Sequence, residues 1–323
     1  MDGSIDFAIG LSEGVAWPWP IAVYLFLAGI SGGALGVVLT TRKLMGTTGV
    51  TPLFKAASCI ALGTILLGMV CLVLDLTNPL FFWRILVFYN PTSVMSIGVM
   101  MLLVYIPTAA FLTIYTMKDE INALLRWIRL PALTKLIDFF AGLVARFEGF
   151  VSWVGLVFAF GVCAYTGFLI SALIRYPLIN TAVLPALFVA SGVSAGTAGA
   201  KLAAVAFFGE SRESHVMHLL HKAEWPMMSA EIAFLFMIGM AMLFGYAGHH
   251  DALRAFTASV WAAEFWIGAV GIGFGVPLVL GLIRSKSAWT FWTAGLASVA
   301  GMMCLRLFIL YAGQMNSVML TVP

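Results

Sequence analysis

The sequence predicts an all-α integral membrane protein with eight transmembrane helices arranged as two four-helix bundles. Hydrophobic residues make up 62% of the 323 residues and charged residues only 10%, whereas a soluble domain carries about 25% charged residues. Several stretches are long and apolar enough to cross a bilayer, which takes about 20 residues. Only helices and closed barrels satisfy their backbone groups in lipid, and uninterrupted runs of this length are helices.

The predicted helices follow one another along the chain, separated by more polar segments. They cover Pro20–Thr41, Leu53–Leu76, Ser93–Tyr115, Gly149–Ile174, Thr181–Phe208, Pro226–Tyr246, Ala255–Ile283 and Ala288–Tyr311. We expect one polytopic membrane domain over 1–323. Its first four-helix bundle comes from 1–117 plus 149–174, and its second comes from 181–323.

The segment 118–148, between the third and fourth predicted helices, mixes charged and apolar residues. A helix of that composition lies in the interface of a membrane rather than across it. We therefore predict an amphipathic cytoplasmic segment at 118–148, which divides the chain into two halves.

The orientation follows from Lys and Arg in the loops, which are enriched on the cytoplasmic side. One set of loops holds twelve of them and the opposite set holds only Arg84, Arg175 and Arg254. This asymmetry places the first set in the cytoplasm, and an even number of spans then puts both termini outside, in the periplasm if the source is a Gram-negative bacterium. We expect a multi-pass protein of a bacterial inner (cytoplasmic) membrane. The N-terminal segment carries no Lys or Arg, so we expect no cleaved signal peptide.

A short motif occurs in both halves. Gly29–Gly36 and Gly192–Gly199 both fit G-x-S-x-G-x-x-G, and both lie in helices that run from outside to inside. The match suggests duplication of a four-helix unit. Small residues at this spacing let helices pack closely, and a nucleotide-binding loop is excluded because no strand precedes the glycines.

Polar residues gather at the outer ends of three helices. They include Tyr24 near Trp17 and Trp19, Asp75 and Asn78 before Trp83 and Arg84, and Tyr165 before Arg175 and Tyr176. Anchoring at the membrane interface explains the Trp residues and Tyr176, but it explains Asp75 and Tyr165 poorly. A quinone ring needs hydrogen-bond partners for two oxygens and a group that takes protons. Asp75 and Tyr165 are therefore the candidate catalytic residues, and Tyr24, Asn78, Arg84, Tyr165 and Arg175 are the candidate quinone contacts.

Charged residues inside the predicted helices require partners, because an unpaired charge in lipid costs at least roughly 2.5–3.5 kcal/mol. By depth, we expect Glu264 to pair with Arg306, and Lys201 with Glu231. The alternative is a proton path through Glu148, Glu224, Glu231 and Lys201.

Other functional classes lack their signatures. No helix interior offers the two histidines that a membrane haem needs, the four cysteines are isolated, and no nucleic-acid motif is present. We therefore expect no haem or metal in this chain and no nucleic-acid partner.

Several segments resemble the NrfD/PsrC-type membrane subunits of polysulfide, nitrite and related respiratory reductases, with the nitrite-reductase-associated NrfD branch the most similar. The resemblance covers almost the whole chain. It is carried by the segments Trp19–Gly33, Asn90–Gly98, Ala164–Ser171, Leu184–Gly192, His221–Glu224 and Arg306–Gln314.

This resemblance implies eight helices in two bundles, no haem, and a menaquinone site near the periplasmic face. It also implies a ferredoxin-like 4Fe-4S partner there, and through it a terminal reductase that uses molybdopterin or multihaem cytochrome c. Tyr165 corresponds to a quinone-contacting tyrosine. Tyr24 stands where some members have a histidine, and Asp75 stands where members vary among acidic residues and histidine.

The function predicted from these observations is exchange of electrons between menaquinol or quinone and an iron–sulfur subunit, with proton release on the periplasmic side. The direction of electron flow is open. Two alternatives remain: a secondary transporter with parallel four-helix repeats, which suits the glycines and the charge pairs, and a passive membrane anchor.

Overall fold

The structure, a computed structural model, is built from helices. It describes residues 17–75, 79–81, 83–88, 90–245, 247–257, 260–283 and 287–314, and no β-strand occurs among them. The candidate site residue Asn78 and the loop cations Arg284 and Lys286 lie outside the described residues.

Eight helices in the described part of the chain are long and apolar enough to span a membrane, which confirms the predicted fold class. They are α1 (Trp19–Met45), α2 (Pro52–Leu74), α4 (Val94–Thr116), α7 (Glu148–Ser171), α8 (Leu184–Phe207), α9 (His215–Phe244), the seventh span Val260–Ile283, and α14 (Ala288–Gln314). The seventh span is made of α12 (Val260–Ala263), the π-helix η2 (Glu264–Gly275) and α13 (Val276–Ile283).

Short elements connect these spans at their ends. They are η1 (Pro79–Phe81), α3 (Arg84–Val87), α5 (Lys118–Trp127), α6 (Ala132–Arg146), α10 (Ala247–Ala252) and α11 (Arg254–Thr257). The predicted amphipathic segment thus folds as two helices, α5 and α6.

Most predicted helix ends agree with the structure to within a few residues, but α9 begins eleven residues before the predicted Pro226. Pro226 lies inside the helix, and Ser214 caps its start by accepting a hydrogen bond from the Met217 N–H. The prediction began the helix at Pro226, where the apolar run begins. The helix itself continues past that boundary into a polar stretch with three histidines, because backbone hydrogen bonding does not depend on side-chain polarity.

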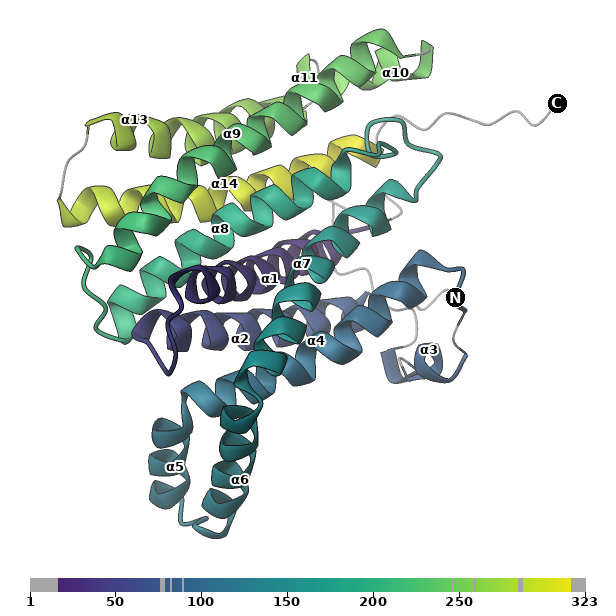
Figure 1. Cartoon of the computed structure of the whole chain (residues 1–323). Coiled ribbons are helices and arrows are strands. Elements are labelled where there is room, and N and C mark those ends of the chain that lie inside the picture. The colour runs from purple at the N-terminus through teal and green to yellow at the C-terminus, as the bar shows by residue number, and fades with distance from the viewer. Residues whose placement is uncertain are drawn as a thin grey trace.

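Figure 1 shows the spanning helices in two groups, which we call the first half (α1, α2, α4 and α7) and the second half (α8, α9, the seventh span and α14). The halves meet where α1 packs along α8. A Cβ on Gly33 would collide with the Gly192 carbonyl oxygen, and one on Gly196 would collide with the Ala34 nitrogen. The contact between α1 and α8 is therefore backbone on backbone. The division of the fold into two separate four-helix bundles stays a prediction.

This contact joins equivalent positions of the two repeated motifs. A Cβ on Gly192 would lie 3.0 Å from the oxygen of Gly29, and one on Gly196 would lie 2.5 Å from the carbonyl carbon of Gly33. Gly29 matches Gly192 in the motif, and Gly33 matches Gly196. Equivalent residues in contact on two parallel helices are what a pseudo-two-fold relation between the halves produces.

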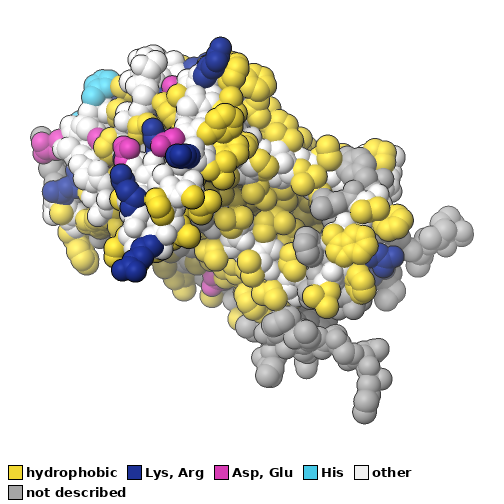
Figure 2. All heavy atoms as spheres, turned by 90° about the horizontal axis from the view of Figure 1, so that it is seen from below, with side chains coloured by type: hydrophobic (Ala, Val, Ile, Leu, Met, Phe, Trp, Pro, Cys, Tyr) yellow, Lys and Arg dark blue, Asp and Glu magenta, His cyan; other side chains and the backbone are white. Residues whose placement is uncertain are grey.

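The surface separates into an apolar zone and a charged end. Figure 2 shows hydrophobic side chains over much of the visible face, with Lys, Arg, Asp and Glu side chains gathered towards one end. This is the end where the last turn of α1 carries Arg42 and Lys43, and from which α5 and α6 extend. We call it the cation-rich end, and the end that carries Trp17, Asp75 and α3 the opposite end.

The opposite end ties the start of the described chain to its finish. The Trp17 N–H donates to Oε1 of Gln314 at 2.9 Å, and Nε2 of Gln314 donates to the Trp17 carbonyl at 3.2 Å. This pair fixes the first turn of α1 against the last turn of α14.

Candidate functional site

Two tyrosines lie near each other in the first half, towards the opposite end. Tyr24 is in the second turn of α1 and is fully buried, and its ring would be 3.3 Å from a Cβ on Gly68 of α2. Its hydroxyl is buried and has no hydrogen-bond partner among the described residues. Tyr24 and Tyr165 are near enough to interact electrostatically. A buried hydroxyl without a partner is costly, which indicates that a water or a ligand completes this site.

A glycine positions the second tyrosine. Tyr165 of α7 is only 6% exposed, and its phenol lies directly on Gly98 of α4, where any Cβ would collide with it. No hydrogen bond of its hydroxyl is recorded among the described residues. The phenol therefore occupies space that the absence of a side chain at Gly98 leaves open.

A third buried tyrosine, which the sequence reasoning missed, lies closer to the centre of the first half. The Tyr105 and Ser31 hydroxyls are 2.8 Å apart, and Ser31 donates to the Ala61 carbonyl at 2.6 Å. Tyr105 is thus satisfied by α1, whereas Tyr24 is not. Tyr105 carries no flanking polar residue in the sequence, so the only available signal was its depth inside an otherwise apolar helix.

Asp75 lies one residue beyond the end of α2 and is partly buried. Burial raises the pKa of its carboxyl. No hydrogen bond or ion pair connects this side chain to another described residue. It lies at the same end of the fold as the tyrosines, and its role in proton transfer stays a prediction.

Arg84 and Arg175 lie at that end too, but their side chains are exposed. The guanidinium carbon of Arg84 is 5.8 Å from the ring centre of Phe81 and 5.7 Å from that of Phe88. Neither arginine is brought into contact with the tyrosines. Their role as quinone contacts stays a prediction.

The second half contains a fully buried arginine. Nη2 of Arg306 in α14 donates to the Ser191 hydroxyl at 2.8 Å and to the Phe188 carbonyl at 3.2 Å, and its guanidinium lies 3.6 Å from the centre of the Phe188 ring. Its Nε and Nη1 have no partner among the described residues. The hydrogen bonds that it makes to described residues are therefore all with α8.

The expected pairing of Arg306 with Glu264 is wrong. The Glu264 side chain lies near Cys304 of α14 instead, since a Cβ on Gly268 would be 3.6 Å from Oε1 of Glu264 and 2.8 Å from Sγ of Cys304. Cys304 and Arg306 are two positions apart on one helix, so their side chains point about 200° apart. The side of α14 that carries Cys304 faces Glu264, so Arg306 points away from Glu264.

The expected pairing of Lys201 with Glu231 is also wrong. Lys201 Nζ lies 2.5 Å from Glu224 Oε1, and Nδ1 of His221 lies 2.9 Å from Glu224 Oε2. Glu231 instead shares the lining of a small cavity with Ser194. Helices α8 and α9 are antiparallel. Ser194 lies seven residues before Lys201 in α8, and Glu231 lies seven residues after Glu224 in α9. The same register therefore puts Lys201 opposite Glu224 and Ser194 opposite Glu231.

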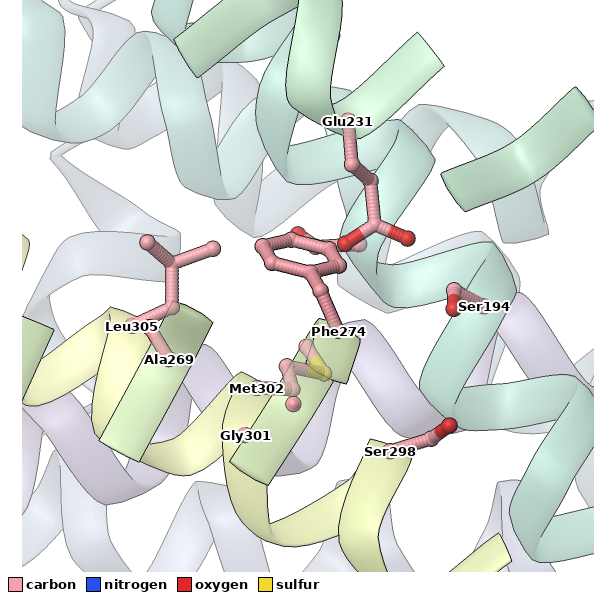
Figure 3. A pocket seen from close by; sticks show the side chains of 10 residues that line it. Ser194, Glu231, Ala269, Phe274, Ser298, Gly301, Met302 and Leu305 are labelled. Carbon is pink, nitrogen blue, oxygen red and sulfur yellow. The ribbon is translucent and has the colours of Figure 1, made fainter. Parts of the chain in front are cut away.

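A small polar cavity lies beside this glutamate. Glu231 is 4% exposed, and its Oε1 has no partner among the described residues. The cavity of about 10 Å³ is lined by Ser191, Ser194, Glu231, Phe274 and Ser298, among others. Figure 3 shows the Glu231 carboxylate and the Phe274 ring side by side along its wall. Its size suits about one water molecule.

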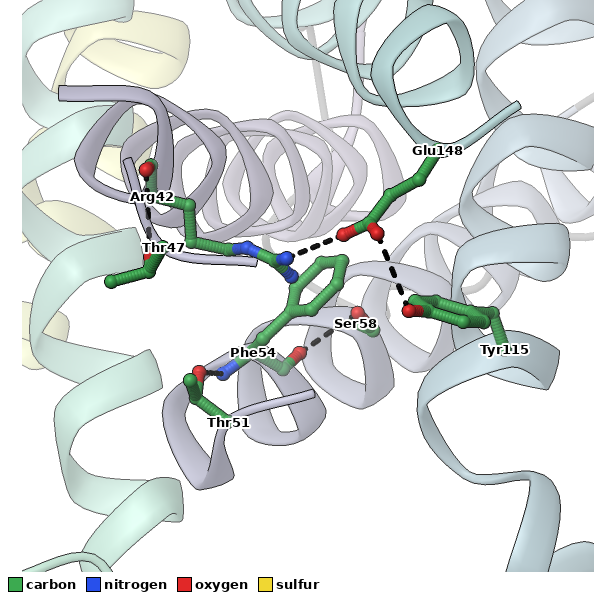
Figure 4. A network of polar contacts seen from close by, with 7 residues as sticks. All are labelled: Arg42, Thr47, Thr51, Phe54, Ser58, Tyr115 and Glu148. Carbon is green, nitrogen blue, oxygen red and sulfur yellow. Dashed lines mark hydrogen bonds and ion pairs between the residues drawn. The ribbon is translucent and has the colours of Figure 1, made fainter. Parts of the chain in front are cut away.

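At the cation-rich end, one network joins the four helices of the first half (Figure 4). Arg42 of α1 pairs with Glu148 of α7 at 2.5 Å and lies 3.9 Å above the centre of the buried Phe54 ring of α2. The Tyr115 hydroxyl of α4 donates to Glu148 Oε2 at 3.4 Å. Glu148 thus serves a structural ion pair.

The described residues contain no group of three or more His, Cys, Asp or Glu side chains arranged to hold a metal ion. What they do bring together is two phenols, Tyr24 and Tyr165, one of them with an unsatisfied buried hydroxyl. Phenol hydroxyls donate and accept hydrogen bonds, so this arrangement suits a flat ligand that carries oxygen atoms.

The fold and the site define the class: a multi-pass membrane protein with polar side chains buried between its helices. Comparison with known proteins then gives the family, since the model of the family described as "Polysulphide reductase, NrfD" matches residues 8–318. The protein belongs to this NrfD family, which confirms the resemblance drawn from its motifs.

Named relatives cover nearly the same length. The protein is 39% identical to a polysulfide reductase chain of Wolinella succinogenes, over 93% of its own length and 95% of the relative. It is 35% identical to "Protein NrfD homolog" of Haemophilus influenzae, over 97% and 99%. It is 34% identical to "Protein NrfD" of Escherichia coli, over 94% and 96%. These similar identities do not separate the branches, so placement in the NrfD branch stays a prediction.

Proposed function

We propose that the protein is the membrane-anchor and quinol-binding subunit of a respiratory oxidoreductase in a bacterial inner membrane. It exchanges electrons between menaquinol or menaquinone and a 4Fe-4S partner subunit, and protons leave at the opposite end. The relative named as part of a polysulfide reductase supports the oxidoreductase complex. The observation that carries the quinone site is the buried, unpartnered hydroxyl of Tyr24 beside Tyr165.

The residues present fit a quinone head group. The ring carries two oxygens, and Tyr24 and Tyr165 each offer a hydroxyl that donates to a quinone oxygen or accepts from a quinol hydroxyl. Gly98 leaves room for the phenol of Tyr165. Quinol oxidation releases two electrons and two protons. In this proposal the electrons pass to the iron–sulfur partner, and Asp75 accepts the protons in turn and passes them to water.

The charge asymmetry of the loops indicates which end of the protein faces the iron–sulfur partner. Cations are concentrated at the end we propose to be cytoplasmic, so Tyr24, Tyr165 and Asp75 face the periplasm. Between α2 and α4, several large apolar side chains are exposed: Leu80, Phe81, Trp83, Val87 and Phe88. Exposed apolar patches next to a site mark surfaces for protein partners, and we place the iron–sulfur subunit here.

Turnover of the purified complex with menaquinol tests this proposal. Tyr165→Phe and Tyr24→Phe each remove one hydroxyl, and loss of a hydrogen bond of about 1 kcal/mol lowers the rate roughly fivefold. Tyr105→Phe is the matched control, because its hydroxyl is already bonded to Ser31. Equal turnover in all three variants and the wild type would remove the tyrosines from the mechanism.

A second role is favoured by one observation, the polar cavity at Glu231. A carboxylate held in the middle of a membrane protein is a functional candidate by default. It would serve a proton path or an ion transporter within the second half. Proteoliposomes that contain the purified protein alone test this role. Proton or ion flux driven by a pH gradient, and lost in Glu231→Gln, would support it. Wild-type proteoliposomes with no more flux than protein-free liposomes would exclude it.

A further inference from the structure

Helices α5 and α6 form a hairpin that extends sideways from the bundle, across the direction of the spanning helices (Figure 1). A polar seam holds its two helices together. The Asn122 amide donates to Asp138 at 2.9 Å, and Lys118 lies 3.3 Å from the same carboxylate. The hydrogen bond from Asn122 and the nearby Lys118 lower the pKa of the Asp138 carboxyl, so it remains ionised at neutral pH.

Both ends of this hairpin are fixed at the membrane boundary. The third span ends at Thr116 and the fourth begins at Glu148, so the hairpin starts and finishes where spanning helices leave the bilayer. Phe111 of α4 and Phe140 of α6 have ring centres 5.6 Å apart, which attaches the hairpin to the bundle. Lys55 of α2 also pairs with Glu120 of α5 at 2.5 Å.

The hairpin leaves an apolar face uncovered. Trp127 is 80% exposed and Phe139 is 63% exposed. Six further large apolar side chains of this segment are exposed: Leu124, Ile128, Leu130, Leu133, Leu136 and Leu143. In water such a face would be a liability, whereas at the level of the lipid interface it is covered by acyl chains.

A row of cations borders this face. Lys135, Phe139, Gly142 and Arg146 are spaced i, i+4, i+7 and i+11, which places them along one side of α6. Both cations are exposed, and neither has an ion pair or side-chain hydrogen bond recorded among the described residues. Lys and Arg in this position keep their stems in lipid and their charges at the phosphates.

The backbone conformation of Arg129, at the tip of the hairpin, independently indicates that its side chain has a function. Its φ is +60°, and it is the one residue other than glycine with positive φ in the described part of the sequence. The Leu130 N–H bonds to the Leu125 carbonyl, the closure of a helix end at which glycine is the favoured residue. An arginine held in a conformation that suits glycine points to a use for its side chain.

We propose that the α5–α6 hairpin binds the phosphate head groups of anionic phospholipids in the leaflet at the cation-rich end, through Arg129, Lys135 and Arg146. The apolar face inserts between the acyl chains, and the cations hold the phosphates at its edge. This surface is separate from Tyr24 and Tyr165 and does not depend on the quinone assignment.

Photocrosslinking of the full-length protein in nanodiscs tests this binding. Two diazirine-bearing probes are compared, phosphatidylglycerol and phosphatidylcholine, and the ratio of their crosslinks to peptides from 118–146 is measured. The wild type should favour phosphatidylglycerol. Lys135→Gln with Arg146→Gln should reduce that preference, since each cation near an anionic surface changes affinity about fivefold. The matched control, Arg212→Gln with Lys222→Gln, removes two exposed cations from the same membrane side and should leave the ratio unchanged.

Arg129→Gly separates lipid binding from folding. Glycine suits the positive φ better, so a purely structural role predicts an unchanged lipid ratio and equal or greater thermal stability. Lipid binding predicts a reduced phosphatidylglycerol ratio at undiminished stability. Equal crosslinking of both probes in the wild type, or variants that keep the wild-type ratio, would overturn the proposal. So would crosslinks to neither lipid, as expected if a soluble protein covers the face.

Discussion

Ser31 and Ser194 occupy the same position of the motif that the two halves share, yet they meet different partners. Ser31 shares a hydrogen bond with the neutral phenol of Tyr105. Ser194 lines a small cavity together with the carboxylate of Glu231, which is near enough to the buried Arg306 to interact with it electrostatically. One half thus surrounds its motif with neutral hydroxyls and the other with ionisable groups.

This difference separates two kinds of polar interior. Burying a neutral phenol costs less free energy than burying a charge, and a phenol suits a ligand that must enter from lipid. Buried charges must stay paired or hydrogen-bonded. The two copies of the motif, one in α1 and one in α8, set the close approach of these two helices. The partners that surround it, rather than the motif, decide what each half does.

The largest expected effect comes from removing Arg306. Arg306→Met removes two hydrogen bonds from a buried charged group, to Ser191 and to Phe188, and each such bond contributes about 1.5–3 kcal/mol. It also removes the positive charge near the buried Glu231. Thermal unfolding in detergent should show a marked loss of stability. The double variant Arg306→Met with Glu231→Gln should be less impaired than the single one. If the two variants unfold alike, the two side chains do not interact.

Asp75→Asn should lower quinol turnover by roughly a hundredfold, the scale of a lost general base. The base must be ionised to accept a proton, so wild-type turnover rises with pH through the pKa of Asp75. Burial raises that pKa, which places the rise above the ordinary value of about 3.9. The variant should lose this rise in a pH–rate profile, and a profile of unchanged shape would assign the proton to another group.

Gly33→Ala and Gly196→Ala test whether the halves are equivalent at their contact. Each Cβ would collide with backbone of the other helix, and such overpacking costs about 1–3 kcal/mol. The two variants should lose similar stability in the same unfolding assay. Gly199→Ala is the control, because its Cβ would meet side chains at an ordinary 3.9 Å. A large loss in only one of the pair would show that the contact is not symmetric.

Hydropathy was enough to predict the eight spans, because each needs only a run of apolar residues. The repeated motif also predicted close packing that the Gly33 and Gly192 contact confirms. The charge pairs were wrong, because depth along the membrane gives the height of a side chain but not its direction around the helix. Lys201 and Arg306 needed the register of α8 against α9 and the facing of α14, which the sequence does not contain.

Tyr105 and the Arg42–Glu148 pair were missed for the same reason. Each depends on which face of one helix meets another, and Arg42 is 106 residues from Glu148 in the sequence. Tyr24 and Tyr165 were predicted from residue type and depth, and the structure places them near each other. The unsatisfied hydroxyl of Tyr24 became visible only once its neighbours were known.

The most direct test is where a quinone binds on the purified protein. An azido-menaquinone probe, activated by light in nanodiscs, should label peptides of α1 and α7 that contain Tyr24 and Tyr165, and excess menaquinone should compete with it. Tyr24→Phe should reduce the labelling, whereas Tyr105→Phe should not. Labelling confined to α8 and α9, or no competition by menaquinone, would contradict the assignment of the quinone site to the first half.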